Sequence, residues 1–106
     1  MFVEVDLSDP AARPALREPD DFDRFKVVFG GSGDLVSAAA ALAPAGKLVN
    51  AQSATLRVDA VRDLAGARAL DPGWRRGFAS MLDYALAKGW LDEQRTNVAV
   101  HCEWSR

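Results

Sequence analysis

The chain has 106 residues, of which 49% are hydrophobic and 26% charged, as is typical of a soluble globular domain. This composition excludes a disordered chain, a collagen and a coiled-coil rod. The longest apolar run is far too short to span a membrane. Thirteen basic against 15 acidic side chains give a net charge of -2, which argues against a dedicated nucleic-acid coat. We therefore expect one domain covering residues 1–106.

The single cysteine, Cys102, cannot form an internal disulfide, so nothing in the chain depends on an oxidising compartment. The first residues lack the basic and apolar regions of a signal peptide. The sequence therefore predicts a cytoplasmic protein.

The N-terminal third contains two expected strands separated by a long connection. Residues 2–7 alternate between apolar and acidic side chains, which indicates a half-buried strand. Residues 8–22 contain three prolines and predict a long loop that wraps the domain or covers a site. Residues 25–29 predict a second strand, with Phe25 and Phe29 on the same face.

The middle of the chain predicts a helix, an extended stretch and a second, shorter helix. Alanine-rich residues 34–43 form the first helix, capped by Ser32 or Asp34. Residues 47–58 are expected to be extended. The short helix covers residues 60–65, with Asp59 as its N-cap.

The strongest helix signal spans residues 72–88. Asp71 is placed to cap it, Pro72 occupies the first helical position, and Gly89 is placed to end it in a left-handed conformation. Its apolar residues, Trp74 among them, recur at helical spacing and form one stripe that should face the core. A final strand follows at residues 97–104.

The order is strand, strand, helix, strand, helix, helix, strand. It predicts an α+β domain with a mixed sheet of about four strands and three helices packed mainly on one face. We expect no cofactor, since no cofactor motif is complete.

A glycine-rich turn lies between the second strand and the first helix. Its residues Gly30, Gly31, Ser32 and Gly33 are the candidate ligand-binding residues, because amides at a helix N-terminus can hold an anion. The turn has no P-loop lysine, and Val36 stands where a dinucleotide fingerprint needs a third small residue. The alternative is a turn whose glycines supply positive φ angles.

His101 and Glu103 are the candidate catalytic residues, because alternation along the last strand puts them on one face. A histidine beside a carboxylate can act as a general base. Glu4 or Asp6 would join them if the first strand were paired alongside. The alternative is a polar cross-strand pair without catalysis. Cys102 should point to the opposite face as a buried, inert thiol.

No metal site is expected. One histidine and one cysteine cannot supply the ligands of a zinc ion. Asp20, Asp21 and Asp23 lack the glycine and distal glutamate of a calcium loop, and we expect them to begin a helical turn.

The order of elements between residues 34 and 104 resembles that of winged helix-turn-helix domains. The resemblance implies that residues 72–88 form a recognition helix and that Arg75 and Arg76 contact DNA. The acidic balance and the core-facing Trp74 argue against this hypothesis.

The placement of Trp104 bears on whether the protein forms a dimer, and two placements are possible. Trp104 either packs beneath the long helix or covers an apolar strand edge that pairs with a second copy. We expect a homodimer, with a small molecule or a protein as ligand, no membrane partner, and DNA only under the winged-helix alternative. The sequence thus favours a small cytoplasmic binding or interaction domain, with a DNA-binding protein or an enzyme using His101 as alternatives.

Overall fold

The structure is a computed structural model that describes residues 1–11 and 13–105. Residue 12, within the expected loop 8–22, and residue 106, at the end of the expected domain, lie outside the described residues. The described chain folds into one six-stranded mixed sheet with three α-helices, which confirms the α+β class. The strands are β1 (Phe2–Asp6), β2 (Ala15–Arg17), β3 (Lys26–Gly30), β4 (Gly46–Asn50), β5 (Ser53–Arg57) and β6 (Asn97–Ser105). The helices are α1 (Leu35–Leu42), α2 (Val58–Ala65), the short 3₁₀ helix η1 (Gly66–Leu70) and α3 (Pro72–Ala87).

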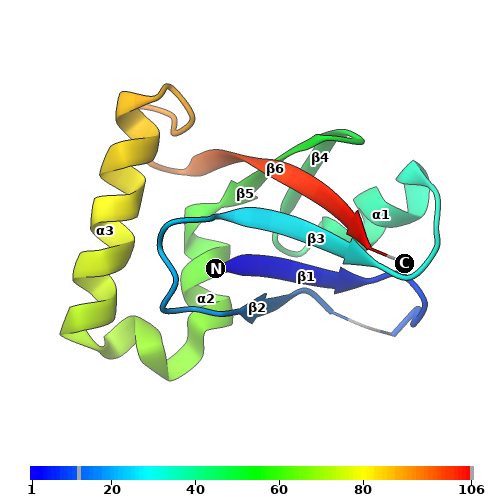
Figure 1. Ribbon diagram of the computed structural model, residues 1–106, viewed down its shortest axis with the longest axis horizontal. Helices are drawn as coiled ribbons and strands as arrows, with labels where there is room; N and C mark the ends of the chain where they lie inside the picture. Colours follow the sequence, from blue (N-terminus) through cyan, green and yellow to red (C-terminus); the bar gives the residue numbers. More distant parts are fainter. Residues whose placement is uncertain (12, 106) are drawn as a thin grey trace.

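The strand order across the sheet is β2-β1-β3-β6-β5-β4. The three central strands β1, β3 and β6 run parallel, and the other pairs are antiparallel. Figure 1 shows the resulting twisted sheet, with α1 and α2 behind it and α3 across one end. The last strand is therefore an inner strand of the sheet.

The expectation of about four strands is wrong, because two short strands were missed. The proline-rich connection contains β2, whose three residues pair with β1 through Val3 and Leu16. The stretch expected to be continuously extended is instead the hairpin of β4 and β5. Asn50 turns this hairpin, since its side-chain oxygen accepts a hydrogen bond of 2.8 Å from the Gln52 amide.

Alternation along the strands separates a buried face from an open one. Val3, Val27 and Cys102 lie side by side in register and are at most 3% exposed. Apolar side chains of all three α-helices complete the same core; they include Leu42, Val61 and Phe78. α1 and α2 thus cover one face of the sheet, α3 closes the core at one end, and the opposite face carries the polar strand residues.

Two helix starts test the capping expectations. α3 begins as expected: the Asp71 carboxylate accepts a hydrogen bond of 3.0 Å from the Trp74 amide. α2 begins at Val58, so Asp59 is not its N-cap. The Val58 amide donates to the Thr96 carbonyl at 2.9 Å and its side chain is buried, so tertiary contacts set the start of this helix. Asp59 instead pairs with Arg62 one turn later.

Candidate functional site

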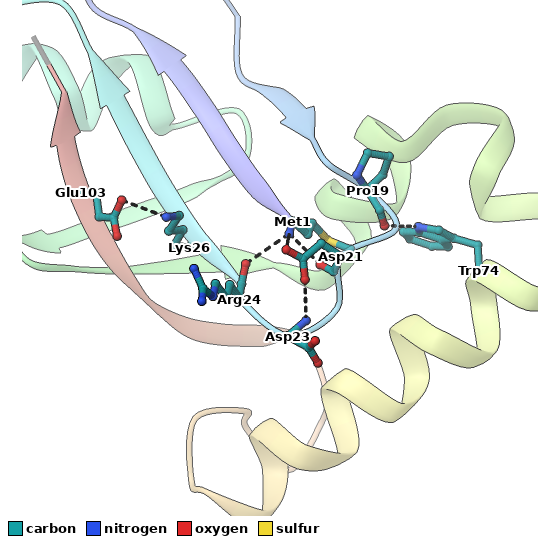
Figure 2. A network of polar contacts seen from close by, with 8 residues as sticks. All are labelled: Met1, Pro19, Asp21, Asp23, Arg24, Lys26, Trp74 and Glu103. Carbon is teal, nitrogen blue, oxygen red and sulfur yellow. Dashed lines mark hydrogen bonds and ion pairs between the residues drawn. The ribbon is translucent and has the colours of Figure 1, made fainter.

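His101 and Glu103 share the open face of β6, as expected, but they do not form a dyad. The Glu103 carboxylate accepts a hydrogen bond of 2.9 Å from the Lys26 ammonium group on β3 (Figure 2). His101 is exposed and lies between Lys26 on β3 and Ser53 on β5 in the sheet register. The carboxylate that would orient the imidazole is therefore engaged by a lysine.

The first strand does not bring further carboxylates to His101, because β3 lies between β1 and β6. Glu4 accepts a hydrogen bond from Arg17 on β2, and Asp6 accepts two from Ser8. These hydrogen bonds from Ser8 hold the pKa of the Asp6 carboxyl below its usual value. Each acidic side chain of β1 is thus engaged locally.

Cys102 lies on the covered face, as expected, and is 3% exposed. Burial raises the pKa of its thiol from 9.0 to about 11, because a thiolate would lose its hydration there. A thiol in this state is a poor nucleophile at neutral pH. Cys102 therefore fills the core and does not act with its neighbours His101 and Glu103.

The glycine-rich turn Gly30–Gly33 connects β3 to α1, and Gly31 has a φ of 78°. Asp34 caps the helix by accepting a hydrogen bond of 2.7 Å from the Ser37 amide. That bond holds the pKa of the Asp34 carboxyl below its usual value. Two ionised carboxylates, Asp34 and Asp6, thus flank the turn. The positive φ angle of Gly31 explains why a glycine occupies that position.

The turn and His101 lie beside opposite ends of β3. His101 pairs with Lys26 at the start of β3, whereas Gly30 ends that strand. Four residues of extended chain separate them by about 13 Å. The structure therefore does not combine the glycine turn, the proline-rich segment and His101 into one pocket.

The three aspartates of the proline-rich segment do not converge on a common point. Asp20 pairs with Arg68 at 2.7 Å, and Asp21 accepts a hydrogen bond of 3.0 Å from the Asp23 amide. Asp20 and Asp21 belong to a turn in which the Asp21 amide donates a hydrogen bond to the Glu18 carbonyl, and Asp23 lies beyond it, so the three residues do not begin the helical turn expected.

Arg75 and Arg76 are exposed on the first turns of α3, while Trp74 is buried, as expected. The helices α2 and α3 are joined through η1 in helix-turn-helix order. The strand that follows α3 is β6, which is inserted between β3 and β5. In the described residues, no further strand follows it as the second strand of a wing.

One hollow lined mainly by apolar side chains was not anticipated from the sequence. It has a volume of about 240 Å³ and lies between α3, the segment before β3 and the first half of β6. Two neighbouring hollows share lining residues with it. We call the three hollows together the aromatic groove and define it by Phe22, Phe25, Met81, Tyr84 and Trp90.

The two neighbouring hollows extend the groove in opposite directions. One, of about 530 Å³, shares Phe22 and Tyr84 and runs along α3 to Gly77 and Ser80. The other, of about 420 Å³, shares Phe25 and Trp90 and ends at polar side chains on the open face of the sheet. Those side chains are Gln52, Ser53 and His101. Most of the lining is apolar. Asp23 and Arg24 lie on the wall before β3 and Ser80 lies at the α3 end, and we call the end at Gln52, Ser53 and His101 the polar end.

The segment before β3 forms one wall and is held from both sides (Figure 2). The Trp74 indole donates a hydrogen bond of 2.8 Å to the Pro19 carbonyl. The amino group of Met1 donates to the carbonyls of Asp21 and Arg24 at 2.6 and 3.2 Å. Burial lowers the pKa of that amino group. These contacts fix the backbone on which Phe22 is carried.

Phe22 itself fits against a glycine of α3. A Cβ atom added at Gly77 would clash with the Phe22 ring. The same ring lies 6.2 Å from the Trp74 indole, centroid to centroid. Gly77 therefore provides the space in which Phe22 packs on the helix.

The end of α3 forms the other wall. Gly89 has a φ of 80°, and its amide donates to the Leu86 carbonyl, while the Trp90 amide donates to the Ala85 carbonyl at 2.8 Å. This pair of bonds is a Schellman motif, which turns the chain back over the last helical turn. The Trp90 carbonyl then accepts a hydrogen bond of 2.7 Å from the Ala99 amide of β6. The Trp90 ring is consequently held in place while 48% of the residue stays exposed.

Comparison of the chain with protein-family models, with curated proteins and with solved structures finds no match. No helix within residues 1–11 and 13–105 is long and apolar enough to cross a membrane. The same part of the chain contains no group of three or more histidine, cysteine, aspartate or glutamate side chains arranged to hold a metal ion.

Proposed function

We propose that this protein is a binding domain that takes an extended apolar segment of a partner protein into the aromatic groove. The observation that carries the proposal is the pair of half-exposed rings, Tyr84 and Trp90, held on rigid backbone beside a preformed hollow. Tyrosine and tryptophan contribute heavily to protein interfaces, since each buries a large area with few rotatable bonds.

The shape of the groove favours an extended chain over a compact ligand. Three hollows follow one another and share lining residues at each junction. Alternate side chains of an extended peptide lie about 6.6 Å apart on one side and can enter successive hollows. At the polar end, Gln52, Ser53 and His101 offer hydrogen-bonding groups to the peptide backbone. In this proposal His101 binds and does not act as a base.

The walls are organised before the partner arrives, which lowers the entropic cost of binding. The Schellman motif holds Trp90, and the contacts of Trp74 and Met1 hold the segment that carries Phe22. Little reorganisation of the groove should therefore accompany binding.

The test is selection of peptides from a random display library on the purified protein, followed by binding measurements on variants. Peptides with two or more apolar or aromatic residues at alternate positions should be enriched. Tyr84→Ala should weaken their binding about tenfold or more, because it removes a central ring. Val36→Ala is the matched control, since Val36 is an exposed apolar side chain on α1, away from the groove. Equal affinity of both variants would refute the proposal.

The native mass of the untagged protein separates this proposal from a small-molecule site. A mass above a whole multiple of the chain mass would mean that a retained compound occupies the protein. If Tyr84→Ala then abolished retention, the groove would be a small-molecule site and the peptide proposal would be wrong.

We also propose that two copies associate through β4. The outer strands of the sheet are β2 and β4, whereas β6 pairs with β3 through residues 101–105 and with β5 through residues 97–101. Trp104 stacks on Phe29 within the chain, with the ring centroids 4.5 Å apart. β4 is the longer edge strand, and Val49 on it is 60% exposed. An unpaired edge of this kind can pair with a second copy. For the cell, we propose a cytoplasmic location, supported by the free thiol of Cys102.

A further inference from the structure

A second hollow lies on the opposite flank of α3 from the aromatic groove. It has a volume of about 540 Å³ and lies between α3 and the segment formed by α2 and η1. We call it the arginine groove and define it by Arg62, Leu70, Trp74, Arg75, Arg76 and Phe78. It is independent of the aromatic groove, since the two share no lining residue.

The lining of the arginine groove is positively charged, whereas the chain as a whole is slightly negative. The protein as a whole carries a net charge of -2. In the described part of the chain, every residue that lines this groove is either an arginine or an apolar residue. Three guanidinium groups thus surround an apolar floor, and no carboxylate is among the described lining residues.

The arginines differ in how they are held. Arg62 lies 5.5 Å above the Phe78 ring and pairs with Asp59 at 3.1 Å, which fixes its position at one side. Arg75 and Arg76 are exposed on α3, and neither forms an ion pair within residues 1–11 and 13–105. Their charges are therefore available to an incoming anionic group.

The apolar floor of the arginine groove indicates whether its anionic ligand is a nucleic acid or an acidic peptide. Leu70 is 79% exposed at the end of η1, beside the arginines. A nucleic-acid backbone presents phosphates and sugars, so it would use the charge of the arginines and leave the exposed leucine without an apolar partner. A peptide that carries carboxylates together with an apolar side chain can use both features, because guanidinium groups bind carboxylates in bidentate geometry.

We propose that the arginine groove docks an acidic segment of a partner protein, with carboxylates on Arg75 and Arg76 and an apolar side chain on Leu70. This surface is separate from the aromatic groove, so a partner protein can contact both flanks of α3. The proposal does not depend on what the aromatic groove binds.

The experiment measures fluorescence anisotropy of a short labelled peptide of alternating glutamate and leucine, at low and at physiological salt. The matched peptides are one in which serine replaces leucine and one in which lysine replaces glutamate. The test variant is Arg75→Ala with Arg76→Ala, two exposed positions. The control variant is Arg13→Ala with Arg17→Ala, which removes the same charge from the exposed β2 region.

The proposal expects the glutamate–leucine peptide to bind more tightly than either matched peptide and to weaken as salt is added. The test variant should lose about tenfold in affinity, as expected for two exposed ion pairs, while the control variant should be unchanged. Leu70→Ser should remove the preference for leucine over serine. The proposal is wrong if the glutamate–leucine peptide does not bind at low salt, if both variants lose affinity equally, or if a labelled DNA duplex binds more tightly than the peptide.

Discussion

The indole of Trp90 packs edge-on against the ring of Tyr84, with the two ring centroids 5.9 Å apart and the planes inclined by 66°. Tyr84 belongs to the last turns of α3, and Trp90 is the second residue after the helix cap. The contact thus joins the two sides of the Schellman motif, where an apolar contact commonly accompanies the hydrogen bonds. It also builds the wall of the aromatic groove from residues that are close in sequence.

Replacing Gly89 with alanine should loosen this wall. Gly89 has a φ of 80°, which a residue with a Cβ atom adopts at a cost of about 1 kcal/mol. We expect Gly89→Ala to lower the free energy of unfolding by about that amount in urea denaturation and to weaken binding in the groove. Gly30→Ala is the control, since an added Cβ there meets nothing within 4 Å. An equal loss of stability in both variants would mean that the left-handed cap is unimportant.

Gly77→Ala should displace Phe22. The added Cβ would clash with the Phe22 ring, so the ring must move out of its place on α3. Overpacking of this kind typically costs about 1 to 3 kcal/mol, partly offset by about 1 kcal/mol of helix propensity. The stability change is therefore modest, and the sharper measurement is peptide binding, which should fall. In a Phe22→Ala background, Gly77→Ala should no longer destabilise the protein, because the ring that it displaces is absent; an equal cost in both backgrounds would contradict the assigned contact.

Trp74→Phe should release the segment that carries Phe22. Phenylalanine keeps an aromatic ring in the core but removes the hydrogen bond to the Pro19 carbonyl. Losing that bond should cost about 1 to 2 kcal/mol. Amide hydrogen exchange of residues 21–24 should quicken more than that of β6. If exchange stayed slow throughout the segment, the indole hydrogen bond would not be what holds it.

Cys102 gives a prediction of pH dependence. The pKa of its thiol is raised from 9.0 to about 11 in the folded protein, so the folded state keeps its proton where the unfolded state has lost it. The stability that this provides is fully present below pH 9, and it falls as the pH rises from 9 to 11. Denaturation at several pH values should show this decline, and Cys102→Ala should make it shallower. An equal decline in both proteins would contradict the assignment to Cys102.

The β4 interface is tested by sedimentation. We expect a dimer that Val49→Lys converts to a monomer, because a lysine on an edge strand opposes pairing. Val36→Lys places the same charge on another exposed valine, on α1, and should leave the dimer intact. A wild-type protein that stays monomeric as its concentration is raised would rule the interface out.

The parts of the fold that the sequence predicts well have strong local signals. Asp71, Pro72 and Gly89 mark both ends of α3, and alternation places Cys102 in the core. The missed strands have weak signals. β2 has only three residues, too few to show alternation, and the β4–β5 turn lacks glycine and proline and depends on a side-chain bond from Asn50.

The site was harder to predict because its walls come from distant segments. Phe22 and Phe25 flank a run of polar residues in the proline-rich connection, which gives no periodic pattern. Trp90 lies two residues after the cap of α3, but its neighbours across the groove are set only by the position of β3 beside β6. The candidate residues that alternation does predict, His101 and Glu103, lie on one face as expected, yet Lys26 from β3 engages the glutamate.

The most direct test of the proposed function is to map amide chemical shifts as a library-selected peptide is titrated into the isotope-labelled protein. The account predicts that the largest changes occur in residues 22–25, at Trp90 and in residues 99–101, and that Tyr84→Ala abolishes them at the same peptide concentration. Changes concentrated instead on α1 or β4, with the aromatic groove unaffected, would contradict it.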